Sequence, residues 1–303
     1  MESWRENRRV FWILALPGTF WLLVFFIVPL GLIWLMSFGE KTSLVDVEIT
    51  GTLANYVRTT DWVYLQILWK SVWISVLATA LCLVIAYPIA FGICFAPPKW
   101  KPLLLLLIIL PFWINLLIRT YSLIAVLRTQ GYLNYTLEYI WAAGKVVFSL
   151  IGLGGLFGEE FQPLEMLYNN AAVVMGLVYV FMPFMVLPLY ATIERLDRSY
   201  LEASLDLGAS QWRTFLSVTV PLTMPGIVSG IILVFIPCLG SFLTPDLLGG
   251  ANAIMIGNVI ERQFKAANDW PFGAALSFLL LYATFGALAL RSLLAGRKRG
   301  MEL

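Results

Sequence analysis

The sequence predicts an all-α, polytopic membrane protein with six transmembrane helices. Of its 303 residues, 60% are hydrophobic and 13% are charged, whereas soluble domains are about 45–50% apolar and about 25% charged. Six apolar stretches also reach the roughly 20 residues that a helix needs to cross a bilayer. A water-soluble fold cannot bury this much apolar surface, so cytosolic enzymes, secreted domains and disordered scaffolds are excluded.

Three further counts narrow the chemistry available to the chain. Histidine is absent, which removes the commonest general base and metal ligand. Cys82, Cys94 and Cys238 lie singly in apolar stretches, so no zinc site or disulfide framework is expected. The formal net charge of +2 gives no indication of nucleic-acid binding. We therefore expect neither a metal site nor a nucleic-acid partner.

Each expected span is bounded by charged or polar residues. The first follows a basic segment, and the uncharged run Val10–Gly39 is longer than the about 7–15 apolar residues of a signal peptide, so we interpret it as an uncleaved anchor. Two shorter apolar runs, 146–158 and 247–260, are expected to lie at the interface or to re-enter the membrane. The six spans are about 11–36, 71–95, 102–126, 171–191, 226–245 and 271–291.

The orientation follows from the Lys and Arg residues that flank the spans, because these concentrate on the cytoplasmic side. With both termini cytoplasmic, 12 of the 20 basic residues fall in short cytoplasmic segments, including 96–101 and 192–225. The external segments are then 37–70, 127–170 and 246–270. The cytoplasmic basic residues are Arg5, Arg8, Arg9, Lys99, Lys101, Arg195, Arg198, Arg213, Arg291, Arg297, Lys298 and Arg299.

Small residues and prolines interrupt the spans. Gly226 and Gly230 have the spacing that allows two helices to approach closely, and proline is tolerated in a span where neighbours or a cavity satisfy the freed backbone groups. A bundle of kinked helices around a path is therefore expected rather than a simple anchor. The prolines are Pro17, Pro29, Pro88, Pro111, Pro183, Pro188 and Pro237.

The cytoplasmic segment 192–225 is the most specific part of the sequence. Ser199 and Glu202 form a capping-box pattern that begins a helix, and Gly208 suits the left-handed position that ends one. Ser210 is expected to cap a second short helix, and Pro221 marks the return to the membrane. These signals predict two short helices joined by a glycine turn.

Two acids lie on one face of the first short helix. Glu202 and Asp206 are four residues apart, a spacing at which like charges cost a few tenths of a kcal/mol. Stability alone does not favour this pair. The segment is therefore either a compact connector or an acidic, leucine-bearing surface presented to a partner, with Leu201 and Leu205 as its apolar contacts.

The spacing of this segment resembles the EAA motif of ABC importer permeases. Glu202-Ala203-Ser204 is followed by three residues, Gly208, nine residues, Val218, one residue and Val220-Pro221. Ser204, Val218 and Val220 are conservative departures from the family pattern. Four more segments, within about 67–292, resemble the permeases of spermidine/putrescine importers: Pro111–Tyr121, Arg128–Asn134, Gly240–Gly250 and Asn268–Ala275.

The resemblance implies a type I ABC importer permease fold and a role for the segment 192–225. The helix from Ser199 to Gly208 would be the coupling helix, which docks in a cleft of a cytoplasmic ATPase subunit. The implied regions are 1–66 (tail, first span and external loop), 67–292 (permease core) and 293–303 (basic tail). The implied docking residues are Ser199, Leu201, Glu202, Ala203, Leu205, Asp206, Gly208 and Pro221.

The same resemblance implies partners and a location. The chain would pair with a second permease subunit, as a hetero- or homodimer, two ATP-binding subunits and a periplasmic or extracellular substrate-binding protein in a bacterial inner membrane. The sequence has no G-x-x-x-x-G-K-[ST] phosphate loop. The chain is therefore expected to be no enzyme and to bind no cofactor, since ATP and Mg would be used by the ATPase.

A polyamine is a polycation, so its path is expected to offer carboxylates and aromatic faces. Asp246 is the first candidate, because it follows Pro245 near the end of a broken span, where an ionisable group is costly unless it is functional. The alternative for Asp246, at equal weight, is a helix-end residue in the headgroup layer. The alternative for the aromatic residues is a role as interfacial anchors. Arg119 would repel a polycation and is expected to snorkel or to pair with an acid at the subunit interface. The remaining candidates are Glu261, Asp269, Trp113, Tyr121 and Trp270.

Other functions remain open from the sequence. Another importer of this class would carry thiamine, ferric iron, sulfate or phosphonate. A secondary transporter would carry coupling-ion carboxylates in mid-membrane, but the spans hold almost no acids. An intramembrane hydrolase with a Ser–His dyad is excluded because histidine is absent, and an assembly factor without transport is a further alternative.

Overall fold

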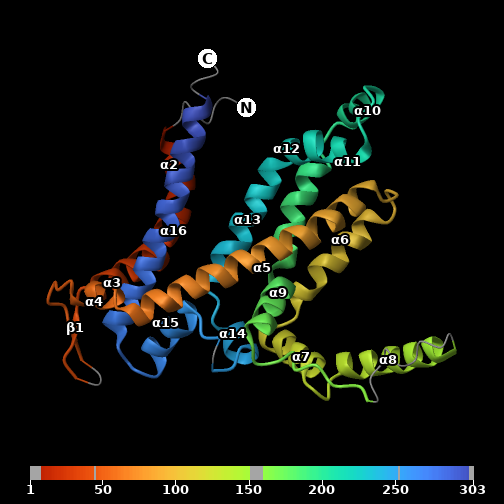
Figure 1. The fold of residues 1–303 in the computed structure, drawn as a ribbon. Helices are drawn as coiled ribbons and strands as arrows, with labels where there is room; N and C mark the ends of the chain where they lie inside the picture. Colours follow the sequence, from red (N-terminus) through yellow and green to blue (C-terminus); the bar gives the residue numbers. More distant parts are fainter. Residues whose placement is uncertain (1–7, 44–45, 151–159, 252, 300–303) are drawn as a thin grey trace. The chain divides into compact units, whose positions relative to one another are not determined.

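The computed structural model describes residues 8–43, 46–150, 160–251 and 253–299. The chain divides into two compact units, one formed by 1–66 with 259–303 and the other by 67–258. Figure 1 shows the helices of both units. Arg5, Glu159 and most of the expected apolar run 146–158 lie outside the described residues.

The first unit contains the predicted first and last spans. None of the side chains in the most apolar window of Phe11–Met36 is buried, so most of this apolar stretch is open to lipid or to another protein. Helix α16 packs against α3 and α4, and the indole of Trp34 donates a 2.6 Å hydrogen bond to the hydroxyl of Tyr282. The elements are α2 (Arg8–Leu22), η1 (Leu23–Ile27), α3 (Val28–Met36), β1 (Glu40–Lys41), β2 (Val47–Glu48), α4 (Ala54–Thr59) and α16 (Trp270–Arg299).

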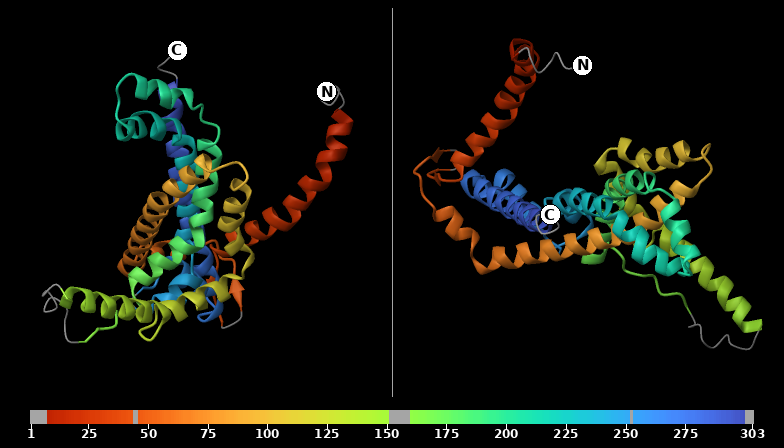
Figure 2. Two further views of the ribbon diagram at one scale, coloured as in Figure 1. Left: turned by 90° about the vertical axis from the view of Figure 1, so that its right-hand side faces the viewer. Right: turned by 90° about the horizontal axis from the view of Figure 1, so that it is seen from above.

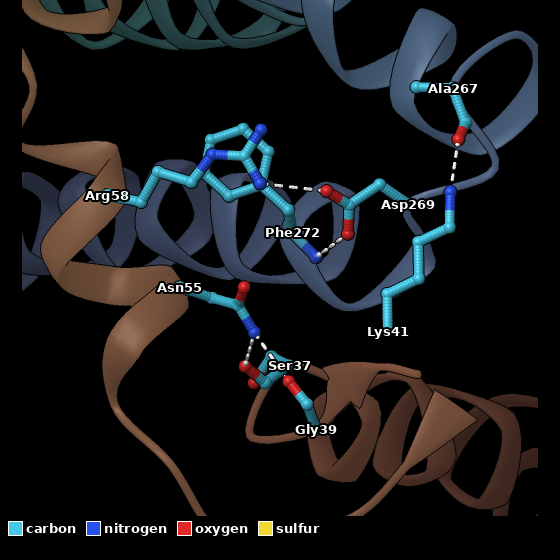
Figure 3. A network of polar contacts seen from close by, with 8 residues as sticks. All are labelled: Ser37, Gly39, Lys41, Asn55, Arg58, Ala267, Asp269 and Phe272. Carbon is cyan, nitrogen blue, oxygen red and sulfur yellow. Dashed lines mark hydrogen bonds and ion pairs between the residues drawn. The ribbon is translucent and has the colours of Figure 1, made fainter. Parts of the chain in front are cut away.

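A polar network joins α4 and the connection after α3 to the start of α16 (Figure 3). Arg58 forms a 2.8 Å ion pair with Asp269, and its guanidinium lies 3.9 Å from the ring centre of Phe272. The carboxylate of Asp269 also accepts a 3.3 Å hydrogen bond from the backbone N–H of Phe272, in the first turn of α16. The Lys41 ammonium donates to the carbonyl of Ala267 at 2.7 Å. Asp269 therefore stabilises this unit by linking α4 to the start of α16.

The second unit is built around α9, of which 61% is buried over its most apolar window. Helix α13 packs along it. A Cβ atom on Gly226 would lie 2.8 Å from the carbonyl oxygen of Pro188, and one on Gly230 would collide with Met185. The close helix approach predicted for these two glycines is confirmed.

Helix α5 begins in the first unit and runs through the second; α15 also crosses the boundary. The elements that complete the chain are α5 (Trp62–Phe95), α6 (Lys101–Ile109), η2 (Leu110–Trp113), α7 (Leu116–Leu127), α8 (Tyr132–Leu150), α9 (Asn170–Ile193), α10 (Ser199–Asp206), α11 (Gln211–Thr214), η4 (Phe215–Thr219), α12 (Val220–Leu222), α13 (Met224–Leu239), α14 (Leu243–Leu248) and α15 (Ile256–Lys265).

Two predicted spans differ from single straight helices. The expected span 102–126 breaks after Trp113, and the helix from Leu116 runs at 98° to the first part. The break has a local cause, because the Asn115 side chain caps α7 by accepting a 2.8 Å hydrogen bond from the N–H of Leu117. Within the ranges that the structure describes, four helices are long and apolar enough to cross a membrane, or up to six if each bent pair is one span.

The expected fifth span, 226–245, ends at Leu239, and α14 follows as a separate short helix. The irregular backbone beyond α14 is buried against protein groups that satisfy it. The N–H of Ile256 donates to the Ser71 hydroxyl at 2.8 Å, and the Asn258 amide donates to the carbonyl of Phe242 at 2.7 Å. Non-helical backbone is tolerated at membrane depth only with such partners. For the run 247–260, a position at the interface or a re-entrant path stays a prediction.

Helix α8 (Tyr132–Leu150) lies within the expected external segment 127–170. Within the second unit, α10 and α11 lie at one end of α9, whereas α7, α8 and α14 lie at the other (Figures 1 and 2). The two candidate regions of the sequence, the segment 192–225 and the surroundings of Asp246, are therefore at opposite ends of this unit.

Candidate functional site

The segment between α9 and α13 forms two short helices, as predicted, but the first is capped by a different residue. Ser199 is the first residue of α10, and the carboxylate of Asp197 accepts a 3.0 Å hydrogen bond from its N–H. The hydrogen bonds from the Ser199 backbone and hydroxyl lower the pKa of Asp197. The capping role expected for Ser199 and Glu202 is wrong, because a carboxylate placed before the helix meets its positive end more favourably than a hydroxyl.

Helix α10 ends at the predicted glycine, Gly208. Gly208 has a φ of +82°, and its N–H donates to the carbonyl of Leu205 at 2.9 Å. A Cβ atom at this glycine would meet nothing within 4 Å, so the requirement for glycine is conformational and not steric. A residue with a side chain in this left-handed conformation costs about 1–2 kcal/mol.

Helix α10 has one face turned to its own chain and one turned outward. Leu201 and Leu205 line a groove of about 590 Å³ together with Phe91 and Phe95 of α5. Glu202, Ala203 and Asp206 are exposed, and Leu207, beyond the helix, is 89% exposed. Leu205 is 44% exposed and can still reach a partner. The outward face is thus acidic, with Leu207 as its most exposed apolar side chain.

Short contacts join the two helices of the segment. The hydroxyls of Ser204 and Thr214 are hydrogen-bonded at 2.9 Å, and Thr214 is 5% exposed. The hydroxyl of Ser210 accepts a 3.3 Å hydrogen bond from the N–H of Arg213, which confirms Ser210 as the cap of α11. The serine that departs from the EAA pattern therefore makes a contact that alanine cannot make.

A group of charged residues at the root of α10 was not anticipated from the sequence. Lys101, at the start of α6, donates to both carboxylate oxygens of Glu194 at 2.8 and 3.0 Å. The hydrogen bond from Lys101 lowers the pKa of Glu194. Arg198 lies 4.9 Å from the ring centre of Phe95 in α5. The connection between α9 and α10 is thus fixed to both α5 and α6.

The connection from α11 to α13 contains a second bend. Pro221 lies in α12, and the helical stretch Gln211–Leu222 makes an angle of 67° with Met224–Leu239. At the junction, the hydroxyl of Thr223 donates to the carbonyl of Thr219 at 2.8 Å and is hydrogen-bonded to the hydroxyl of Tyr87 at 2.8 Å. This buried contact ties the bend to α5.

The six candidate pathway residues do not form one site within a single unit. Asp246, in α14, is exposed, as are Trp113 and Tyr121, at 76% and 57%. These three belong to the second unit.

The other three candidates belong to the first unit and have partners there. Glu261 forms a 3.0 Å ion pair with Lys265, and Asp269 is paired with Arg58. The indole of Trp270 donates to the side chain of Asn268 at 2.9 Å. Glu261 and Asp269 are both less exposed than Asp246.

Across the ranges that the structure describes, no group of three or more acidic or cysteine side chains gathers as a metal site. The three cysteines are buried and unbridged.

This combination of helices and the glycine-ended α10 defines the class of protein. The chain belongs to the family of binding-protein-dependent transport system inner membrane components, whose model matches residues 7–299. It is 44% identical over 260 residues to the spermidine/putrescine transport system permease protein PotB of Escherichia coli (strain K12), covering 86% of this chain and 88% of that protein. It is 41% identical over 257 residues to PotB of Haemophilus influenzae, covering 85% and 84%.

The fold has a counterpart among solved structures. A bacterial ABC transporter involved in the import of the acidic polysaccharide alginate contains a chain that matches with a TM-score of 0.71 and 16% identity, covering 98% of this chain and 99% of that one. At this identity the match shows the fold alone. It shows that an ABC importer contains a chain of this fold.

The ion pair between Lys101 and Glu194 predicts a pH-dependent contribution to stability. The side chains are 18% and 38% exposed, so a double-mutant cycle with Lys101→Met and Glu194→Gln should give about 0.2–1 kcal/mol in thermal unfolding at pH 7. Because the pKa of Glu194 is lowered in the folded chain, this energy is present above the unfolded value of about 4.3 and is lost as the pH falls through the folded value. An interaction energy that stayed constant from about pH 7 down to about pH 3.5 would contradict this assignment.

Proposed function

We propose that this chain is the transmembrane permease subunit of an ATP-driven polyamine importer and forms half of its substrate pathway. The observation that carries the proposal is the 44% identity to PotB across 86% of the chain. The glycine-ended α10 supports the proposal, because the EAA resemblance assigns the ATPase-docking role to this helix. The six-span topology with cytoplasmic termini, in a bacterial inner membrane, is part of the same proposal.

The contacts of α10 suggest how a force from the ATPase subunit on α10 moves the substrate pathway. An ATPase subunit would bind the outward face that carries Glu202, Ala203 and Asp206. The inward side chains Leu201 and Leu205 line a groove together with side chains of α5 and η4. Helix α10 contacts α11 and η4, and the connection before it is attached to α6 by an ion pair. A displacement of α10 is therefore passed to several spans at once. The 67° junction at Thr223 is the proposed hinge of this two-state movement.

The proposed assembly contains a second permease subunit, two ATP-binding subunits and a substrate-binding protein. The family description, binding-protein-dependent transport, supports the last of these, as does the solved alginate transporter in complex with a periplasmic protein. ATP hydrolysis is assigned to the partner subunits because the sequence has no phosphate loop.

ATP-dependent uptake tests the function directly. Proteoliposomes that contain the complete complex should accumulate spermidine when ATP is enclosed with the ATPase subunits and the binding protein is supplied outside. Uptake that needs an ion gradient but not ATP would favour a secondary transporter. ATP-dependent uptake of thiamine, ferric iron, sulfate or phosphonate, without spermidine uptake, would assign the chain to another importer.

Substitution of Gly208 tests whether α10 couples ATP hydrolysis to transport. Gly208→Val places a β-branched residue in a left-handed conformation and should reduce spermidine-stimulated ATPase activity at least tenfold. Gly208→Asn is the matched control, because asparagine tolerates this conformation and should retain most of the activity. Equal activity of the valine variant and the wild type would remove Gly208 from the coupling mechanism.

Asp246 is the proposed contact for an ammonium group of the substrate. Asp246→Asn should weaken transport of tetravalent spermine more than that of divalent putrescine, by several-fold in the ratio of the two initial uptake rates. Asp246→Glu keeps the charge and should preserve the ratio. An equal loss for both polyamines, or no loss, would exclude Asp246 from the pathway.

A further inference from the structure

Arg119 in α7 is a buried cation without an acceptor. The residue is 6% exposed, and its Nε and Nη1 atoms are enclosed and have no hydrogen-bond partner among the described residues. An arginine side chain stays charged in proteins. The sequence led us to expect that Arg119 would snorkel or would pair with an acid at the subunit interface. Its burial does not fit snorkelling, and the pairing at the subunit interface stays a prediction.

The surroundings of Arg119 do not compensate its charge. The guanidinium carbon lies 5.7 Å from the ring centre of Phe112, close to the outer limit of about 6 Å for a cation–π contact. Phe112 packs edge-on against Phe184 of α9 at 4.8 Å, so the aromatic pair holds the side chain in place. A buried charge needs both a counter-charge and hydrogen bonds, and one distant ring supplies neither.

Thr120, the next residue, shows how a buried polar side chain on α7 can be satisfied. Thr120 is fully buried, and its hydroxyl donates a 2.8 Å hydrogen bond to the carbonyl of Leu116 one turn earlier. The long guanidinium of Arg119 cannot be satisfied in this way, because a carbonyl of its own helix offers no negative charge. Nη2 is not among the enclosed atoms, which leaves this edge of the guanidinium open to an approaching group.

We propose that Arg119 is one half of an ion pair between the two permease subunits, in which a carboxylate of the second permease subunit accepts hydrogen bonds from the guanidinium. This inference rests on the proposed assembly. The required ligand is an anion, so the transported polycation cannot be that ligand. A hydrogen bond from the open Nη2 atom to a carboxylate is charge-assisted and therefore stronger than one between neutral groups.

The outer surface of α7 favours a membrane-embedded partner over a soluble one. Val126, two turns from Arg119 on the same side of α7, is 37% exposed, and Leu117, Ile118 and Tyr121 on the other sides of the helix are 43%, 61% and 57% exposed. Helix α7 belongs to a bent pair of helices that together are long and apolar enough for a broken span or a re-entrant loop. An acid that reaches Arg119 must therefore cross an apolar surface, and a second permease subunit can bury that surface at the same time.

Co-purification of the two permease subunits tests the ion pair. In the complete complex, Arg119→Glu should reduce recovery of the second permease at least tenfold, because two carboxylates would then face each other. Arg119→Leu leaves one buried carboxylate unpaired and should reduce recovery several-fold, while Arg119→Lys should be intermediate between Leu and the wild type. Arg128→Glu, an exposed arginine just beyond α7, is the matched control and should assemble normally.

Suppressor mutations identify the source of the carboxylate. In cells that carry Arg119→Glu, changes that restore assembly should replace an Asp or Glu of the second permease by Lys or Arg. Suppressors confined to this chain, such as Asp246→Lys, would overturn the proposal, as would dependence of wild-type assembly on anionic lipid that Arg119→Leu abolishes. Wild-type recovery of Arg119→Leu would also overturn it.

Two measurements separate this inference from other failures. A monodisperse elution profile and wild-type helicity of the isolated variants show that they fold. Assembly is scored by recovery of the second permease and does not depend on the cargo, so a wild-type complex that assembles through Arg119 but does not import spermidine contradicts the proposed substrate only.

Discussion

The attachment of α10 to neighbouring parts of its own chain is the constraint on which the rest of the account depends. Leu201 and Leu205 share a groove with Phe91 and Phe95, and Arg198 lies over the ring of Phe95. Because these contacts occupy one face of a two-turn helix, its acids must face outward. A helix of eight residues is too short to be stable alone. Its position is therefore set by α11 and η4, which it contacts, and by the connection from α9, where Arg198 lies over a ring of α5.

The same logic explains how the chain tolerates breaks in its apolar helices. At 113–116 the Asn115 side chain satisfies the new helix end, and near Met255 the side chains of Ser71 and Asn258 satisfy an irregular backbone. In an apolar environment these bonds have no water to replace them. The bends are thus built features of the fold, and they divide two of the predicted spans into separate helices.

Local chemistry was predictable from the sequence, and non-local pairing was not. The φ of Gly208 and the cap at Ser210 follow from residue type and immediate neighbours. Ser199 was misassigned because Asp197, two residues earlier, competes for the same helix end. Asn115 in fact offered a signal for the break in the third span. The pairs Lys101–Glu194 and Arg58–Asp269 join residues far apart in sequence, and no periodicity encodes them.

Site-specific cross-linking of α10 tests the central claim most directly. The native cysteines are buried, so a single cysteine introduced by Ala203→Cys on the exposed face gives a selective attachment point. In membranes that hold the intact complex, a short bifunctional reagent should link residue 203 to an ATP-binding subunit, with a yield that changes between nucleotide-free and ATP-bound states. Labelling of residue 203 only from the external side, or no link to such a subunit, would contradict the role given to α10.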